Sequence, residues 1–315
     1  MKNILINIFV NIFVIICVIS GIVFLQFKFT NTVLISTKNF ITLCDHYAPE
    51  LRVFESTDIP KTYPRKDGES IYIHTTALDR FVKEYLPNIK YKFFLLTGDS
   101  DRPVPGDEPY KEIINHPLLI IWFSQNCTNP IGKLQQIPIG IDYHSLEKES
   151  MKWGEKQTPK KQERTLFSCV TTKPKTNKCY ANYHLNMENK RYSYDRRDAL
   201  NQVPKELVFY EPTEVTRTES WKNMVKYKYT ISPLGNGLDC HRTWEAIALG
   251  CIPIVRTSPL DPLYDGLPVL IVSKWTDITQ QLLDNFKPSY KNMERMKIKY
   301  WINKIKKNKY SNGTK

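Results

Sequence analysis

The densest group of residues that could do chemistry lies between residues 232 and 245. An apolar run leads into the glycine-rich loop Gly235-Asn236-Gly237, and a helical pattern follows. Glycines at such a junction permit positive φ angles and close backbone approach, and Asp239 is a natural N-cap for the helix. A helix N-terminus behind a strand can face phosphate, so the loop is a candidate diphosphate cradle. The candidate ligand-binding residues are Ser232, Pro233, Gly235, Asn236, Gly237, Asp239, His241, Arg242 and Glu245.

Three of these residues share one face of the predicted helix. Arg242 and Glu245 are three positions apart, and His241 and Glu245 four, so a helix places all three side by side near its N-terminal end. A cation near a helix N-terminus opposes the helix dipole. An anion that faces Arg242, such as a nucleotide diphosphate, would explain why an arginine stands there. Glu245 is suited to accept hydrogen bonds from ribose hydroxyls. The alternative is an Arg242–Glu245 ion pair covering a capped helix.

A second set of polar residues follows the predicted strands of the first half. A group-transfer reaction needs a base near the incoming hydroxyl, and side chains at strand ends can face a cleft. We favour Asp99 or Asp101 as this base, with turn capping as the alternative role. The full set of candidates is Asp99, Asp101, His74, Asp142 and His144.

These residues are positioned by two successive series of alternating strands and helices. Such alternation predicts an α/β protein with parallel, doubly wound sheets. In the first series we expect strands at 70–75, 91–97, 117–123 and 136–141, and a helix at 77–86. In the second we expect strands at 166–170, 207–210, 227–232, 252–256 and 269–272, and helices at 194–202, 219–225, 240–249 and 276–286.

Residues 4–27 are apolar except for isolated polar positions, and they are long enough to cross a bilayer, which takes about 20 residues. No small-residue cleavage site follows Ser20, so the segment predicts an uncleaved anchor. Lys2 lies on one side and Lys28 and Lys38 on the other, which leaves the orientation open. We expect a single-pass membrane protein and favour a folded part in the lumen of the Golgi or ER.

The net charge of +13 is concentrated in residues 287–315, whose apolar positions recur at near-helical spacing. This predicts a basic amphipathic helix that packs back on the fold. No zinc spacing or RNA-binding signature accompanies the charge, so we expect no nucleic-acid partner. Six cysteines lie outside the apolar segment, an even number compatible with lumenal disulfides, and no C-x2-C pair indicates a metal site.

The run SPLGNGLDCHRTWEAIALGCIPIV at 232–255 resembles the C-terminal donor-binding signature of exostosin-like glycosyltransferases. In that signature an arginine and a glutamate three residues later precede a Gly-Cys-x-Pro strand. The segments TGDSDRPVP at 97–105, WFSQNC at 122–127 and IPIGIDYH at 137–144 resemble uncharacterised proteins that share it. Together these segments span most of residues 70–285.

The resemblance implies a GT-B fold of two facing Rossmann-type domains behind one N-terminal transmembrane helix. It also implies inversion at the anomeric carbon, a UDP-sugar donor, a glycan or protein acceptor, and no essential metal or cofactor. Arg242 and Glu245 match the motif and inherit its donor-binding roles. The expected regions are a transmembrane anchor at 1–27, a stem and entry segment at 28–68, an acceptor-side domain at 69–150, a linker at 151–164, a nucleotide-sugar-binding domain at 165–286, and a basic helix and tail at 287–315.

Two other functions remain open. Asp99-Ser100-Asp101 follows an apolar strand, which is how single-domain GT-A glycosyltransferases hold manganese or magnesium against the donor diphosphate. A non-catalytic, sugar-binding membrane protein would keep the cleft but would have no need for Arg242 and Glu245 together.

Overall fold

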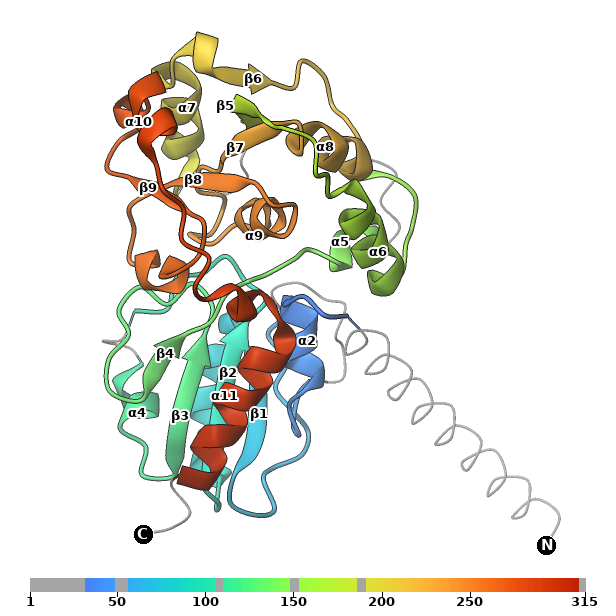
Figure 1. The fold of residues 1–315 in the computed structure, drawn as a ribbon. Helices are drawn as coiled ribbons and strands as arrows, with labels where there is room; N and C mark the ends of the chain where they lie inside the picture. The colour runs from blue at the N-terminus through green and yellow to red at the C-terminus, as the bar shows by residue number, and fades with distance from the viewer. Residues whose placement is uncertain (1–31, 49–55, 106–109, 148–152, 186–190, 312–315) are drawn as a thin grey trace, which may run out of the picture.

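The computed structural model describes residues 32–48, 56–105, 110–147, 153–185 and 191–311. These residues form two parallel β-sheets, one of four strands and one of five, each covered by helices (Figure 1). The chain is therefore a mixed α/β protein, as the alternation of strands and helices predicts, and its two sheets are consistent with a two-domain Rossmann-like fold.

The first sheet has the strand order β1-β2-β3-β4. Alternate residues of β2 enter different cores: Phe93 and Leu95 pack on one face, Phe94 and Leu96 on the other. Because both faces are covered, all six residues of this strand are buried, as expected for a central parallel strand. The strands are β1 Glu69–His74, β2 Phe93–Gly98, β3 Leu119–Ser124 and β4 Leu134–Gln136.

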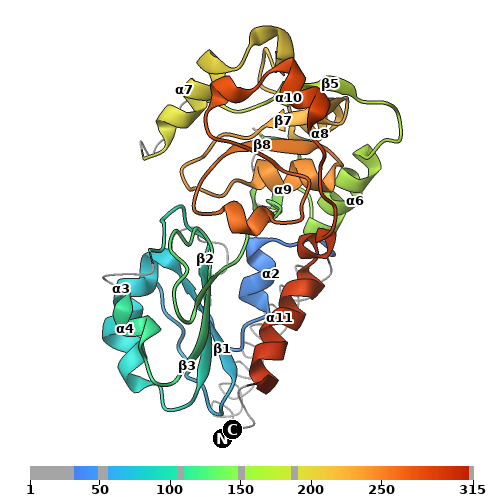
Figure 2. The same cartoon turned by 60° about the vertical axis from the view of Figure 1, so that its left-hand side comes forward.

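The two faces are covered by segments of different origin (Figure 2). One face is covered by the local connections, which are η1 Thr75–Ala77, α3 Leu78–Arg80, η2 Phe81–Tyr85, η3 Leu86–Asn88 and α4 Lys111–Ile114. The other face is covered by the two chain ends, α2 Thr37–Thr42 and α11 Ile298–Ser311.

The second sheet has the order β6-β5-β7-β8-β9, so the direction of winding reverses between β5 and β7. Its strands are β5 Thr176–Ala181, β6 Val208–Tyr210, β7 Tyr227–Ile231, β8 Ile252–Arg256 and β9 Leu270–Val272. Its helices are α7 Ser193–Gln202, α8 Arg217–Met224, α9 His241–Ala248 and α10 Gln280–Asn285, with short turns η5 Lys205–Leu207, η6 Asp261–Tyr264 and η7 Trp275–Asp277. Helices α5 His144–Glu147 and α6 Pro159–Cys169 precede this sheet.

The C-terminal helix α11 returns to the first sheet, where it packs beside α2. Trp301 and Ile305 are buried, and the Trp301 ring meets that of Phe40 with centroids 6.4 Å apart. At the first residue of α11, which follows η8 Met293–Met296, the backbone N–H of Ile298 donates to the carbonyl of Val33 at 3.0 Å. Residues 32–48, expected to belong to a stem, are thus part of the core of the first lobe.

Two expected strands are wrong. Residues 166–169 belong to α6 and Val170 is its C-cap. Thr158 caps the start of this helix by accepting from the Lys161 N–H, and the helix overlaps the expected linker. The fourth strand of the first sheet is β4, and residues 137–143 instead form an irregular segment that passes between the sheets. Strand β5, which completes the second sheet, was not expected.

The predicted membrane segment, residues 4–27, lies outside the described residues. Among the helices that the structure describes, none is long and apolar enough to cross a membrane. The six cysteines of the described ranges are free thiols, so they do not form the disulfides that their even number would allow.

Candidate functional site

A cavity of about 700 Å³ opens where the carboxyl ends of the two sheets face each other. One wall comes from the residues after β5 and from the loop between β7 and α9. These two strands are neighbours at the reversal of the strand order, which is where doubly wound sheets bind ligands. The opposite wall comes from Asp99, Asp101 and the segment from Ile139 to Ser145.

Most of the predicted site residues line this cavity. They are Asp99, Asp101, Gly235, Asn236, Gly237, Asp239, His241, Arg242 and Glu245. Ser232 and Pro233 do not line it. The Ser232 hydroxyl lies 2.9 Å from that of Thr243, and the Pro233 carbonyl accepts from Arg242 Nη1 at 3.4 Å, so both support the loop from behind.

One end of the cavity is cationic, because Arg196 of α7 and Arg242 of α9 both line it. Arg196 is buried and donates to the carbonyls of Leu234 and His184, at 3.1 and 2.7 Å. Arg242 lies over the Tyr183 ring, 5.4 Å from its centroid. Burial and the charge of Arg242 lower the pKa of Arg196 to about 10, so the Arg196 guanidinium remains charged at neutral pH. Within the described part of the chain, neither has a carboxylate within ion-pair distance.

The glycine-rich loop approaches its neighbours closely, as expected, but its glycines do not adopt positive φ angles. A Cβ on Gly237 would lie 3.1 Å from Asn126 Nδ2 and 3.2 Å from Asp101 Oδ1, both in the first lobe. A Cβ on Gly235 would lie 3.5 Å from Arg196 Nη2. The contact with Arg196 is an ordinary van der Waals distance, whereas the closer contacts at Gly237 show that a small residue there lets the first lobe approach the loop.

The expected helix cap is wrong. The N-cap of α9 is Cys240, which makes no side-chain capping bond. Asp239 instead connects the lobes: its Oδ2 accepts from the Ile139 N–H and its Oδ1 from Trp244 Nε1, each at 2.8 Å. Burial raises the pKa of Asp239 to about 6, although these hydrogen bonds act in the opposite direction.

Glu245 is buried at the cavity wall and does not pair with Arg242. Its Oε2 accepts from Trp221 Nε1 at 3.0 Å, and its Oε1 lies 3.3 Å from Arg217 Nη2. Oε1 makes no hydrogen bond in the described structure. Oε1 is almost completely covered by protein atoms, and its charged neighbour is Arg217, so a ligand hydroxyl reaches this atom only if these side chains shift.

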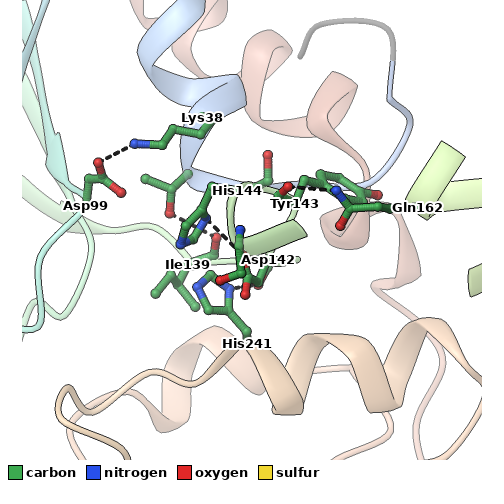
Figure 3. Close-up of polar contacts among 12 residues, drawn as sticks. Lys38, Asp99, Ile139, Asp142, Tyr143, His144, Gln162 and His241 are labelled. Atoms are coloured by element: carbon green, nitrogen blue, oxygen red, sulfur yellow. Dashed lines mark hydrogen bonds and ion pairs between the residues drawn. The ribbon is translucent and has the colours of Figure 1, made fainter. Parts of the chain in front are cut away.

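The other end of the cavity holds a cluster of Asp142, His144 and His241 (Figure 3). Asp142 Oδ1 lies 3.1 Å from His144 Nδ1, and its Oδ2 accepts from Arg217 Nη2 at 2.5 Å. His241 Nδ1 lies 2.7 Å from the Gly140 carbonyl oxygen. One ligand atom from each of the three cluster residues lies within 4.8 Å of the others, close enough to hold a metal ion. However, Arg217 already supplies a positive charge to the carboxylate.

The environment of Asp99 differs from that expected of a base. Its Oδ2 accepts from Lys38 Nζ at 2.5 Å (Figure 3). His74 Nδ1 lies 3.4 Å from the same oxygen. The side chains of Lys38 and Asp99 are 4% and 2% exposed, so the pair is shielded from solvent. Asp99 is also one of the described non-glycine residues with a positive φ, 53°. Its carboxylate is thus committed to an internal ion pair.

A scan against models of protein families finds no match to this chain, and a search of curated proteins also finds none. The functional argument therefore depends on the geometry of the cavity and on the sequence signature.

Sequence reasoning missed two arginines of the cavity, Arg196 and Arg217. Arg196 lies on an expected helix, but strand β5, which precedes that helix, was not expected. The position of Arg196 at the reversal of the strand order could therefore not be inferred. Arg217 starts α8 next to a capping box formed by Thr216 and Glu219. That box predicts where the helix begins but gives no sign that Arg217 faces the cavity.

Proposed function

We propose that this protein is an inverting glycosyltransferase of the GT-B type, related to the exostosin-like enzymes. It would transfer a sugar from a nucleotide diphosphate donor, UDP-sugar in the first instance, to a hydroxyl of a glycan or protein acceptor. The observation that carries the proposal is the pair Arg196 and Arg242. Both line a cavity at the reversal of strand order, beside a glycine-rich loop, with no carboxylate partner among the described residues.

Each part of the donor has a counterpart in the cavity. The diphosphate would lie between the two arginines, because guanidinium groups bind phosphate oxygens through paired hydrogen bonds. The ribose would lie against Glu245, which lines the cavity. The sugar would then face the wall of the first lobe, where the acceptor enters. As the glycosidic bond breaks, the arginines stabilise the charge that develops on the diphosphate.

This assignment gives the arginines the role that a metal ion has in GT-A enzymes, so transfer would need no divalent cation. Lys38 supports this assignment, because its ammonium group already neutralises Asp99 in the Asp-x-Asp pattern. The apolar segment at 4–27 would anchor the enzyme in a Golgi or ER membrane, with the cavity in the lumen.

The full chain, purified in detergent, can be tested against a panel of nucleotide sugars, with release of nucleoside diphosphate as the readout. We expect turnover of at least one UDP-sugar, unchanged by EDTA, and calorimetric binding of UDP. Arg242→Ala is the matched variant and should reduce turnover about 10²- to 10³-fold, comparable to the loss of one preorganised donor. Absence of both turnover and UDP binding would reject the proposal. Loss of turnover in EDTA with recovery in manganese would support the GT-A alternative.

A further inference from the structure

The cluster of Asp142, His144 and His241 in the cavity has a defined protonation pattern. Asp142 is held from three directions. Its Oδ2 accepts from Arg217 Nη2 at 2.5 Å, its Oδ1 accepts from the Ser145 N–H at 2.9 Å, and its backbone carbonyl accepts from Arg217 Nη1 at 2.5 Å. Burial alone would raise the pKa of Asp142, but Arg217, His144 and His241 outweigh it and hold the pKa well below its usual value. The carboxylate is therefore ionised and fixed in place.

An ionised carboxylate can only accept a hydrogen bond, so the nitrogen of His144 that faces it must carry the proton. That nitrogen is Nδ1, which lies 3.1 Å from Asp142 Oδ1. The lone pair of His144 is consequently on Nε2. No residue of the described structure hydrogen-bonds to Nε2, and His144 lines the cavity. His144 therefore has a carboxylate next to Nδ1 and an acceptor nitrogen, Nε2, that no described residue occupies.

His241 has the same tautomer for a different reason. Its Nδ1 lies 2.7 Å from the Gly140 carbonyl, which can only accept, so Nδ1 carries the proton. The two rings lie side by side, with centroids 5.3 Å apart (Figure 3). The two rings differ in the group that lies next to Nδ1. A carboxylate stabilises an imidazolium that forms on His144, whereas a neutral carbonyl does much less for His241.

We propose that His144, oriented by Asp142, is the general base that takes the proton from the acceptor hydroxyl, an assignment that rests on the proposed transferase function. The hydroxyl oxygen forms a bond to the anomeric carbon while the bond from that carbon to the diphosphate oxygen breaks. The electron pair of the broken bond stays on the diphosphate, beside Arg196 and Arg242. The hydroxyl proton moves to His144 Nε2, and the imidazolium next to Asp142 later releases it to solvent.

The surroundings of His144 keep it unprotonated before the reaction. Burial, His241 and Lys38 lower its pKa, Asp142 and Asp99 raise it, and the result is about 4. His144 is thus unprotonated at neutral pH, with a basicity close to that of an ordinary aspartate, whose pKa is about 3.9. Arg217 belongs to α8 in the second lobe and Asp142 to the segment between the lobes, so the base is assembled only when the two are in contact.

Hydrolysis of the donor tests this assignment without a known acceptor, because water must lose its proton to the same base. In the full chain, His144→Gln and Asp142→Asn should each lower the kcat for hydrolysis of the UDP-sugar, the former by about 10²- to 10⁴-fold. The dissociation constant of UDP should stay within about twofold, since neither residue lies at the cationic end. The acid limb of the wild-type pH–rate profile, near pH 4, should disappear in His144→Gln.

Two further variants serve as comparisons. His116→Gln, at the amino end of β3 and far from the cavity, should hydrolyse the donor like wild type. His241→Gln should lose less activity than His144→Gln.

The outcomes separate the base assignment from the function. Absence of turnover and of UDP binding in wild type rejects the transferase proposal itself. Wild-type turnover together with full activity in His144→Gln, or a greater loss in His241→Gln, overturns only the base assignment. Loss of wild-type activity in EDTA with recovery in a divalent metal also overturns it, because Asp142, His144 and His241 would then be metal ligands.

Discussion

Arg217 Nη2 lies 2.5 Å from Asp142 Oδ2, and this contact joins the second lobe to the segment that leads out of the first. The same nitrogen lies 3.3 Å from Glu245 Oε1, and the guanidinium lies over the Trp221 ring, 5.7 Å from its centroid. All three charged side chains are at most 12% exposed. One buried cation thus compensates two buried carboxylates at the base of the cavity.

Arg217→Ala should therefore be strongly destabilising. It leaves Asp142 and Glu245 buried without a counter-charge, and breaking a buried pair in this way costs about 3–5 kcal/mol. The control is Arg80→Ala, which removes an exposed ion pair to Glu84 that should contribute no more than about 1 kcal/mol. Urea denaturation at pH 7 measures both free energies of unfolding. Similar small losses in the two variants would contradict the idea that Arg217 supports the cavity.

The stability of the protein should depend on His144 between pH 6.5 and 4. The pKa of His144 is lowered to about 4 in the fold, whereas an unfolded histidine has a pKa of about 6.5. The unfolded chain binds the proton more tightly in this window, so stability falls as the pH falls from 6.5 to 4. The shift corresponds to about 3 kcal/mol as an upper bound.

The measurement compares the free energy of unfolding of wild type and His144→Gln across this window. The variant should lose less stability than wild type as the pH falls. Asp239, whose pKa is raised to about 6, has the opposite slope in the same range, but it is present in both proteins and cancels in the difference. Parallel curves for the two proteins would show that folding does not lower the pKa of His144.

The sequence predicted much of the second lobe because its apolar runs are short, continuous and separated by turns. It failed at α6 for a clear reason. Leu166 and Cys169 are buried while Phe167 and Val170 are exposed, which is helical spacing, but four of the five residues from 166 to 170 are apolar, which resembles a short strand. Strand β5 was missed because its first half is polar and partly exposed, and only its last three residues are buried.

The residues of the candidate site also include some that the sequence predicted and some that it did not. Arg242 and Glu245 were predicted because they share one helix, where spacing in sequence determines spacing in space. Arg196 and Arg217 reach the cavity from two other helices, whose approach depends on the strand order. The ion pair of Asp99 depends on Lys38, which belongs to a segment that was expected to be a stem.

The apolar segment at 4–27 predicts that the full chain is an integral membrane protein. Alkaline carbonate extraction of membranes that contain the chain should leave it in the pellet, because a span of about 20 apolar residues is not released by removing peripheral contacts. A variant that starts at residue 32, where the described fold begins, is the matched control and should be released. Release of the full chain, or a mature N-terminus beyond Ser20, would contradict the anchor.

Glu245→Gln should weaken binding of the nucleoside but not of the phosphates. The amide keeps one acceptor oxygen but loses the charge-assisted hydrogen bonds to ribose hydroxyls, about 1.5–3 kcal/mol for such bonds. Titration calorimetry should show weaker binding of UDP with binding of inorganic pyrophosphate unchanged. Glu84→Gln, at an exposed site, is the control and should bind both like wild type. Equally weakened binding of UDP and pyrophosphate would contradict the assignment of Glu245 to the ribose.

Arg196→Ala and Arg242→Ala should weaken binding of UDP and of inorganic pyrophosphate alike, because both arginines are assigned to the diphosphate. Loss of one charge-assisted contact corresponds to about 1.5–3 kcal/mol, or about 10- to 150-fold in the dissociation constant. Arg197→Ala is a closely matched control, since Arg197 is the next residue on the same helix and is exposed. Melting curves should show that the three variants remain folded. The two cavity variants should also flatten the salt dependence of pyrophosphate binding, which follows from the loss of a charge at the site. If Arg196→Ala binds pyrophosphate as tightly as Arg197→Ala does, this end of the cavity is not an anion site, and the placement of the donor fails with it.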